Sequence, residues 1–204
     1  VWDWDDGCNL GSQKHDWEPN STNSNGCTGF SVTNLERDNG NASCVDGLDP
    51  NTNDDDAPCI NGWKDSESAN DDRELYFQVT FGFGDEGALS AFEFYQMAPP
   101  VIDNDEECND YPQQLRVKIF KNGTLVVQEY FPTNQTQWEK VTVNFPGTTG
   151  HYSGFTIFRF EIIAFDLAGI DFDDYDCSGD ANEAFGLDEV RLIGCCGPLG
   201  GGDC

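Results

Sequence analysis

Residues 74–194 contain several segments in which apolar and polar side chains alternate, the pattern of strands with one buried face and one wet face. We find no convincing amphipathic helix between them. Six or more strands joined by turn-rich loops predict an all-β chain, folded as an antiparallel β-sandwich whose two sheets bury their aromatic faces against each other. The predicted strands are Leu75–Phe81, Ala88–Tyr95, Leu115–Phe120, Leu125–Tyr130, Trp138–Phe145, Phe155–Ile162 and Leu187–Ile193.

The clearest local signal is a β-hairpin between two of these segments. Lys121-Asn122-Gly123-Thr124 joins Leu115–Phe120 to Leu125–Tyr130. Asn and Gly tolerate the positive φ that both central residues of a type I′ turn require, and this turn matches the twist of paired strands. The sequence therefore predicts a tight turn centred on Asn122 and Gly123.

The N-terminal region of the chain has a different composition. Residues 5–73 are rich in Asp, Asn, Ser and Gly and contain only short apolar runs. We expect a long looped region here, restrained by its cysteines. The chain is predicted to be a single β-sandwich domain spanning 1–204, with a loop-rich, disulfide-stapled N-terminal region at 1–73, core strands at 74–194 and a Cys- and Gly-rich tail at 195–204.

Nine cysteines without any C-x-x-C spacing favour disulfides over a metal site, and disulfides indicate an oxidising compartment. Nine is odd, so at least one thiol stays free or pairs outside the chain. We expect the adjacent Cys195 and Cys196 to reach two different segments, because a bond between neighbours forms a strained ring. The cysteines lie in loop-like sequence or the tail, which predicts that they staple loops rather than strands. They are Cys8, Cys27, Cys44, Cys59, Cys108, Cys177, Cys195, Cys196 and Cys204.

The chain carries 10 Lys and Arg against 38 Asp and Glu, a formal net charge of -28 at pH 7. This charge repels nucleic acid phosphates and anionic lipid headgroups, so both are poor partners. The most apolar stretch, 154–170, contains three charged residues and is not a transmembrane segment. Four glycosylation sequons agree with an extracellular protein, either secreted or at the cell surface: Asn20, Asn41, Asn122 and Asn134.

Several short motifs resemble the jelly-roll β-sandwich modules of secreted bacterial surface proteins and the carbohydrate-binding modules of that fold. The motifs are Glu74-Leu-Tyr-Phe-Gln-Val-Thr, Gln114-Leu-Arg-Val-Lys, Trp138-Glu-Lys-Val, Phe158-Arg-Phe-Glu and Gly186-Leu-Asp-Glu-Val-Arg-Leu-Ile-Gly, within residues 74–194. The resemblance implies a jelly-roll sandwich, often stabilised by calcium, in a surface or polysaccharide context. In such modules a carboxylate of the last strand often meets the N-terminal segment at a structural calcium, which implies Asp188 together with Asp3 or Asp5. The cysteine-rich front end and the Cys195-Cys196 ending depart from the usual pattern.

The stretch most typical of a metal site lies at 174–183. Oxygen-bearing side chains at alternate positions, followed by Gly179, match the first half of a calcium loop. Phe185 stands where the bidentate Glu is expected, so Glu183 or Asp188 would close the site instead. Bound Ca²⁺ is one interpretation, and a solvated acidic loop held by Cys177 is the other. The candidate ligands are Asp174, Asp176, Ser178, Asp180, Glu183 and Asp188.

Nothing in the sequence has the signature of an active site. His15 and His151 are the only histidines, and we interpret both as exposed loop residues. Neither a G-x-S-x-G elbow nor an H-E-x-x-H pair occurs, and the E-x-D-x-x-E strand motif of jelly-roll glycosidases is absent. Two facing carboxylates would suffice for glycoside hydrolysis, but 38 acidic residues make no pair specific. We therefore predict that the chain is not an enzyme.

Two functional interpretations remain. The odd cysteine and the tail ending in Cys204 favour a non-catalytic extracellular structural protein, a self-associating subunit of a surface fibre, sheath or matrix, stabilised by disulfides and calcium. The alternative is a carbohydrate-binding module with a polysaccharide partner. Aromatic residues in loop-like sequence could stack on sugars or cap the edge of a core: Trp2, Trp4, Trp17, Trp63 and Tyr111. A row of exposed aromatic rings would favour sugar binding.

Overall fold

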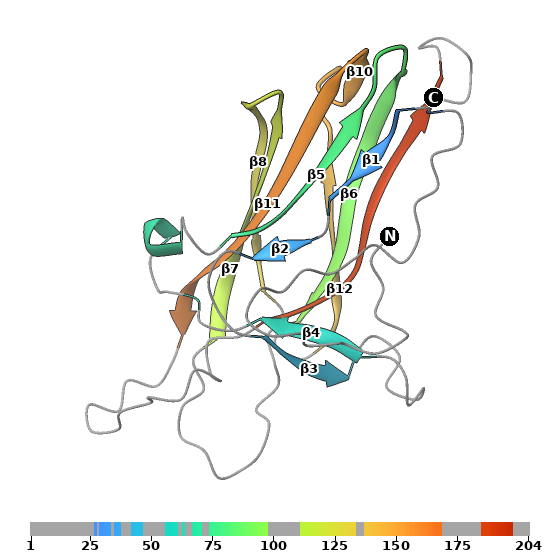
Figure 1. The fold of residues 1–204 in the computed structure, drawn as a ribbon. Helices are drawn as coiled ribbons and strands as arrows, with labels where there is room; N and C mark the ends of the chain where they lie inside the picture. The colour runs from blue at the N-terminus through green and yellow to red at the C-terminus, as the bar shows by residue number, and fades with distance from the viewer. Residues whose placement is uncertain are drawn as a thin grey trace, which may run out of the picture.

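The computed structural model shows two antiparallel β-sheets packed face to face as a jelly-roll-like β-sandwich, which confirms the predicted fold class (Figure 1). The described residues contain twelve strands and one short 3-10 helix, and no α-helix. The structure describes residues 27, 29–33, 35–37, 42–46, 56–60, 63, 67–70, 74–97, 111–133, 137–168 and 185–197.

The first sheet has the strand order β1-β5-β11-β7-β8, and β2 pairs with β5 beside β1. The long strand β11 is hydrogen-bonded along both edges, to β5 on one side and to β7 on the other. The strands of this sheet are β1 (Ser31–Val32), β2 (Glu36–Arg37), β5 (Leu75–Phe81), β7 (Tyr111–Lys121), β8 (Thr124–Pro132) and β11 (Thr156–Ala168).

The second sheet has the order β10-β6-β12-β4-β3, and β9 pairs with β6 on the same side as β10. Along its described strands, the chain passes from one sheet to the other seven times, after β2, β4, β5, β6, β8, β10 and β11. The strands are β3 (Ala42–Asp46), β4 (Asp56–Ile60), β6 (Glu86–Met97), β9 (Glu139–Asn144), β10 (His151–Ser153) and β12 (Phe185–Cys196), and the helix η1 (Glu67–Asn70) contacts β11.

All seven predicted strands are present, most of them longer than the alternation indicated. The β7–β8 hairpin turns at Asn122 (φ 49°) and Gly123 (φ 78°), as the Asn-Gly pair predicted. The front region also contains regular structure, because the short strands β1 to β4 and the helix η1 lie within it. These strands have only two to five residues, too few for local alternation to reveal them, and all except β3, which pairs with β4, are hydrogen-bonded to strands further along the chain. His151 lies in β10 and not in a loop.

The core between the sheets is built mainly from aromatic rings. Phe77 of β5 and Phe160 of β11 stack with their centroids 4.6 Å apart, and Phe92 of β6 meets Phe160 from the opposite sheet at 5.1 Å. Side chains of β5 alternate between buried and partly exposed along its whole length. The front region also contributes to the core, since Leu35 and Trp63 are fully buried.

A disulfide between Cys27 and Cys196 joins the segment before β1 to the end of β12, and so links the two sheets. Cys195 is also disulfide-bonded, so the two adjacent cysteines reach different segments, as predicted. The expectation that cysteines staple only loops is wrong, because β12 continues through Cys195 and Cys196. The strand extends this far because both cysteines pair with β6, opposite Ala88 and Gly87.

Tyr152 of β10 packs against this disulfide. Its hydroxyl donates to the carbonyl of Cys195 at 2.8 Å, and its ring stacks on Phe81 with centroids 3.7 Å apart. Nearby, the buried Asp85 carboxylate accepts hydrogen bonds from the backbone nitrogens of Gly29 and Gly82, both at 2.9 Å. These contacts hold the start of β1 to both sheets.

We expect Phe160→Ala to lower the free energy of unfolding by about 3–5 kcal/mol, because it leaves a cavity among three packed rings. Phe83→Ala is the matched control, since the Phe83 side chain is 88% exposed and its loss should change stability by no more than about 0.5 kcal/mol. Urea unfolding followed by tryptophan fluorescence measures both variants. Equal losses in the two variants would contradict the aromatic core described above.

Alkaline pH should destabilise the protein through Tyr152. Burial raises the pKa of the Tyr152 hydroxyl to about 12, and the Asp85 carboxylate adds to this shift. The unfolded chain loses this proton near pH 10, so the folded state binds more protons between pH 10 and 12 and the free energy of unfolding falls as pH rises through that window. In Tyr152→Phe the fall should be shallower. Parallel curves of unfolding free energy against pH for the two proteins would show that Tyr152 is not the group responsible.

Candidate functional site

The side of the first sheet that faces away from the core, here called the outer face, collects polar and aromatic side chains. Because side chains alternate along a strand, residues between the buried positions of β5, β11, β7 and β8 all point outward. The register places Lys118 between Gln128 of β8 and Glu161 of β11, and Glu161 beside Tyr76 of β5. One row away, Arg116 lies opposite Tyr130 of β8.

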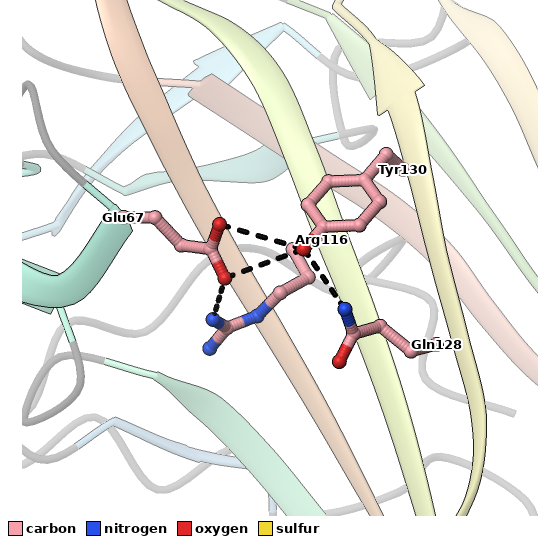
Figure 2. A network of polar contacts seen from close by, with 4 residues as sticks. All are labelled: Glu67, Arg116, Gln128 and Tyr130. Atoms are coloured by element: carbon pink, nitrogen blue, oxygen red, sulfur yellow. Dashed lines mark hydrogen bonds and ion pairs between the residues drawn. The ribbon is translucent and has the colours of Figure 1, made fainter.

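A network of polar contacts on the outer face holds Tyr130. Its hydroxyl accepts a hydrogen bond from Gln128 Nε2 at 2.9 Å and donates to Glu67 Oε2 at 3.4 Å. Figure 2 shows the Glu67 carboxylate reaching from η1 toward both Tyr130 and the Arg116 guanidinium, with which it forms an ion pair. The network therefore joins η1 to the two strands of the hairpin.

The Arg116–Glu67 pair explains why the network is well defined. The Arg116 side chain is only 4% exposed, and a guanidinium removed from water requires a carboxylate partner. Glu67 supplies this carboxylate, and its second oxygen is then available to the Tyr130 hydroxyl. Phe165 of β11 meets the Tyr130 ring edge-on at 6.2 Å. The ring is thus fixed at its hydroxyl and along one edge, yet Tyr130 remains 48% exposed.

A second cluster surrounds Arg159 on β11. Its guanidinium lies over the Tyr76 ring, 4.1 Å from the centroid, and Nε donates to Glu161 Oε1 at 2.6 Å. One terminal nitrogen donates to Glu74 Oε1 at 3.3 Å. Lys118 lies between the two clusters and has no ion-pair partner within the part of the chain that the structure describes.

These groups are suited to recognising hydroxyl groups. Guanidinium, carboxylate and carboxamide side chains offer donors and acceptors in fixed planes, and an aromatic ring offers an apolar face. The outer face presents all four kinds of group within two neighbouring rows of the sheet. Chemically, it can bind a ligand that has both hydroxyl edges and apolar C–H faces.

A second pair of exposed rings lies at the tips of two turns. Phe83, in the turn between β5 and β6, is 88% exposed, and Phe155, in the turn before β11, is 50% exposed. Their centroids are 5.5 Å apart and the ring planes are 26° apart. Phe83 lies outside the predicted strands, and Phe155, predicted as the first residue of a strand, lies in the turn before β11.

The predicted calcium ligands fall mostly outside the described residues. Asp188 is an exception: it is buried in β12, and its Oδ1 accepts a hydrogen bond from the backbone nitrogen of Glu189 at 2.6 Å. The described residues contain no group of three or more His, Cys, Asp or Glu that could hold a metal ion. Calcium therefore stays a prediction. The ligands outside the described residues are Asp174, Asp176, Ser178, Asp180, Glu183, Asp3 and Asp5.

The structure places two of the five aromatic residues that were candidates for stacking on sugars. Trp63 is fully buried in the core, which favours the core interpretation over sugar stacking at this position. Tyr111 begins β7 and does not lie in a loop, while Trp2, Trp4 and Trp17 lie outside the described residues. The sequence analysis missed Tyr130 as a candidate, although its alternation with Gln128 in the predicted strand indicated that the two share a face.

Two other sets of candidates can be placed in part. Asn122 is exposed at the tip of the β7–β8 hairpin, and the sequons Asn20, Asn41 and Asn134 lie outside the described residues. Cys44 and Cys59 lie in β3 and β4, while Cys8, Cys108, Cys177 and Cys204 fall outside. Among the described residues, no helix is long and apolar enough to cross a membrane.

Comparison with known proteins gives similarities of fold only. No protein-family model matches the chain, and no curated protein matches it significantly. The carbohydrate-binding module TmCBM61, solved with β-1,4-galactotriose, is 12% identical, with a TM-score of 0.38 over 80% of this chain and 87% of that one. The CBM22-2 xylan-binding domain of Xyn10C from Paenibacillus barcinonensis is 14% identical, with a TM-score of 0.37 over 90% and 99%.

The α-L-arabinofuranosidase MgGH51, solved with arabinose, is 10% identical, with a TM-score of 0.40 over 81% of this chain and 23% of that one. The chain therefore spans less than a quarter of that enzyme's length. The two carbohydrate-binding modules are of the class that the sequence motifs resemble, and at these identities the likeness concerns the β-sandwich fold alone.

Proposed function

We propose that this protein is a non-catalytic, extracellular carbohydrate-binding β-sandwich, and that the outer face of its first sheet binds a polysaccharide. The observation that carries this proposal is the Tyr130 ring, which is half exposed and held in one orientation by Gln128, Glu67 and Phe165. The proposal rests on the residues of this face and not on the similarity of fold.

Sugar rings have two kinds of surface, and the outer face matches both. The C–H groups of a pyranose form an apolar face that packs on an aromatic ring, while its hydroxyls need planar donors and acceptors at the edge. Tyr130 offers the ring, and the carboxamide of Gln128 and the ammonium of Lys118 lie in the adjacent row. A ligand seated on Tyr130 therefore has hydrogen-bonding groups within reach.

The charges of this face agree with an uncharged ligand. Arg116, Lys118 and Arg159 face the carboxylates of Glu67, Glu74 and Glu161, and Asp166 adds one carboxylate beside Gln114 of β7, so this face is close to neutral although the whole chain has a formal charge of -28. A balanced surface neither attracts cations nor strongly repels anions. We infer that hydroxyl groups, rather than charged groups, are the main feature recognised.

The network also lowers the cost of binding. Side chains that must be ordered by a ligand reduce its affinity, whereas Tyr130 is already ordered by contacts within the protein. The buried Arg116–Glu67 pair is the anchor of this order. The outer face is therefore preorganised before a ligand binds.

Tyr130→Ala should weaken polysaccharide binding roughly 10-fold or more, about 1.4 kcal/mol, because it removes the stacking surface. Tyr130→Phe is the matched control, since it keeps the stacking ring but loses the hydroxyl contacts that order it, so its affinity should fall less than that of Tyr130→Ala. Affinity electrophoresis through gels that contain neutral polysaccharides identifies a ligand, and titration calorimetry measures the variants.

Phe83→Ala tests the other exposed aromatic surface in the same assays. Binding that survives in Tyr130→Ala but is lost in Phe83→Ala would move the site to the turn tips. Absence of binding to every plant, algal, fungal and bacterial polysaccharide tested would contradict the proposed function.

A second candidate function is self-association into a surface fibre, sheath or matrix. The observation in its favour is β8, a nine-residue strand at the edge of the first sheet whose free side pairs with no strand that the structure describes. Such an edge offers unpaired backbone groups to a second chain. Leu125 of this strand is exposed and does not block the approach.

Leu125→Lys should prevent association through β8, because an edge lysine opposes strand addition. Phe83→Lys makes the same change of charge at a different exposed position and serves as the control. Light scattering in calcium and in excess chelator should show assemblies of wild type and Phe83→Lys, and monomers of Leu125→Lys. A monomeric mass for all three proteins, with one monomer band on both reducing and non-reducing gels, would rule out this candidate.

A further inference from the structure

The tip of the β7–β8 hairpin is attached to the neighbouring strand by Asn122. Its backbone nitrogen donates to the carbonyl of Ile157 at 2.8 Å, and its side-chain Oδ1 accepts from the backbone nitrogen of Ile157, also at 2.8 Å. The side chain thus continues the β7–β11 ladder where the backbone turns away. The Asn122 carboxamide is therefore held in one orientation at an exposed position.

This contact also settles which end of the carboxamide faces the sheet. A backbone N–H needs an acceptor, so the atom beside the Ile157 nitrogen is the oxygen. The planar amide then places Nδ2 on the other side, away from β11. No described residue bonds Nδ2, and the Gly123 that follows has open space around it. Asn122 thus presents its amide nitrogen to solvent.

Two residues close to Asn122 in the sequence are relevant to the attachment of a sugar at this nitrogen. Thr124, two residues after Asn122, is exposed and completes an Asn-Gly-Thr sequon. Phe120, two residues before Asn122, lies opposite Arg159 on the outer face, and the ladder continues from there to Asn122 opposite Ile157. Phe120 therefore lies at the hairpin end of the outer face, two residues from Asn122.

Phe120 and its cross-strand partner Leu125 form an apolar floor beside the turn. Phe120 is half-buried, and Leu125, directly opposite it on β8, is 45% exposed. Water in contact with these side chains is unfavourable, and a group that displaces it gains stability in proportion to the apolar area covered. The first sugar of a glycan on Nδ2 has a C–H face that can cover this floor.

We propose that Asn122 is N-glycosylated and that the first sugar, an N-acetylated hexose, packs on Phe120 and Leu125. In the transfer, Nδ2 loses one proton and bonds to the anomeric carbon of the sugar. The bond from that carbon to the diphosphate of a lipid-linked oligosaccharide donor breaks, and the diphosphate leaves with the electron pair. The hydrogen bond from Ile157 to Oδ1 is retained, because the modified nitrogen is the other arm of the amide.

This inference goes beyond the proposed function and does not depend on it. Phe120 lies four residues from Arg116 along β7, roughly 13 Å at the rise of an extended strand. The glycan would therefore lie beyond the Tyr130 network and form the border of the outer face at its hairpin end. A protein that binds no polysaccharide could carry the glycan, and the reverse is also true.

The first test is occupancy. The full chain is secreted from a eukaryotic host and its Asn122 peptide is analysed by mass spectrometry before and after treatment with peptide N-glycosidase. We expect the peptide to carry a glycan, Thr124→Ser to keep it, and Thr124→Ala to lose it completely. An unmodified Asn122 in the secreted protein overturns the proposal, whatever the state of the other three sequons.

The second test concerns the packing of the sugar. Asn122→Asp keeps the acceptor for Ile157 and removes only the glycosylated nitrogen. The difference in melting temperature between wild type and Asn122→Asp is measured in protein from the eukaryotic host and in protein from a host that adds no N-glycan. The first difference should exceed the second by roughly 2–4 °C, the shift expected for a contact of ordinary strength in a chain of this size.

The same pair of differences is then measured in a Phe120→Thr background, in which Phe is replaced by a β-branched residue that also favours strands and the floor loses its ring. The excess should fall by at least half, and any loss of stability from Phe120→Thr itself cancels between the two hosts. An excess that is unchanged by Phe120→Thr, or absent in the wild-type background, overturns the packing of the sugar on this floor.

Discussion

Strand β11 is paired along both of its edges, and its register controls the rest of the first sheet. Phe160 lies opposite Phe77 on β5 and opposite Ile119 on β7, so all three side chains enter the core together. Because side chains alternate, the same register sends Arg159 and Glu161 outward. A shift by one residue would exchange the two sets and place charged groups among the core rings. Burial of the aromatic layer therefore decides what the outer face contains.

The outer face shows how a buried charge can organise an exposed ring. Arg116 lies on β7 beside Glu67 of η1, and this carboxylate offsets the cost of removing the guanidinium from water. This pairing brings a carboxylate beside the Tyr130 hydroxyl, and the ring becomes ordered without becoming buried. The same principle applies at Arg159, where two carboxylates and the Tyr76 ring surround one guanidinium. Both clusters are built from residues distant in the sequence.

One end of the sandwich is held by two different means. At one position the Cys27–Cys196 disulfide, the Tyr152 ring and the Asp85 carboxylate attach the segment before β1 to both sheets. At the hairpin tip a single side chain, Asn122, replaces the backbone in the ladder with β11. The positive φ that makes Asn favourable in the turn also directs its carboxamide toward Ile157. One residue thus serves the turn and the sheet.

The sequence by itself determined the strands of residues 74–194, their buried faces and the Asn-Gly turn. Alternation and turn preference depend only on residues that are neighbours in the sequence. The sequence did not reveal β1 to β4, which are short and of which β1, β2 and β4 pair with strands further along the chain, or the burial of Trp63, which depends on the packing of the core. Sugar-stacking rings were predicted only in loop-like sequence, and Tyr130, which lies in a strand, was therefore not among them. Only the tertiary structure decided that site, because the ring owes its fixed position to Glu67, 63 residues earlier, and to the register of β7 and β8. Contacts between distant segments form only when the sheets assemble, and no local pattern records them.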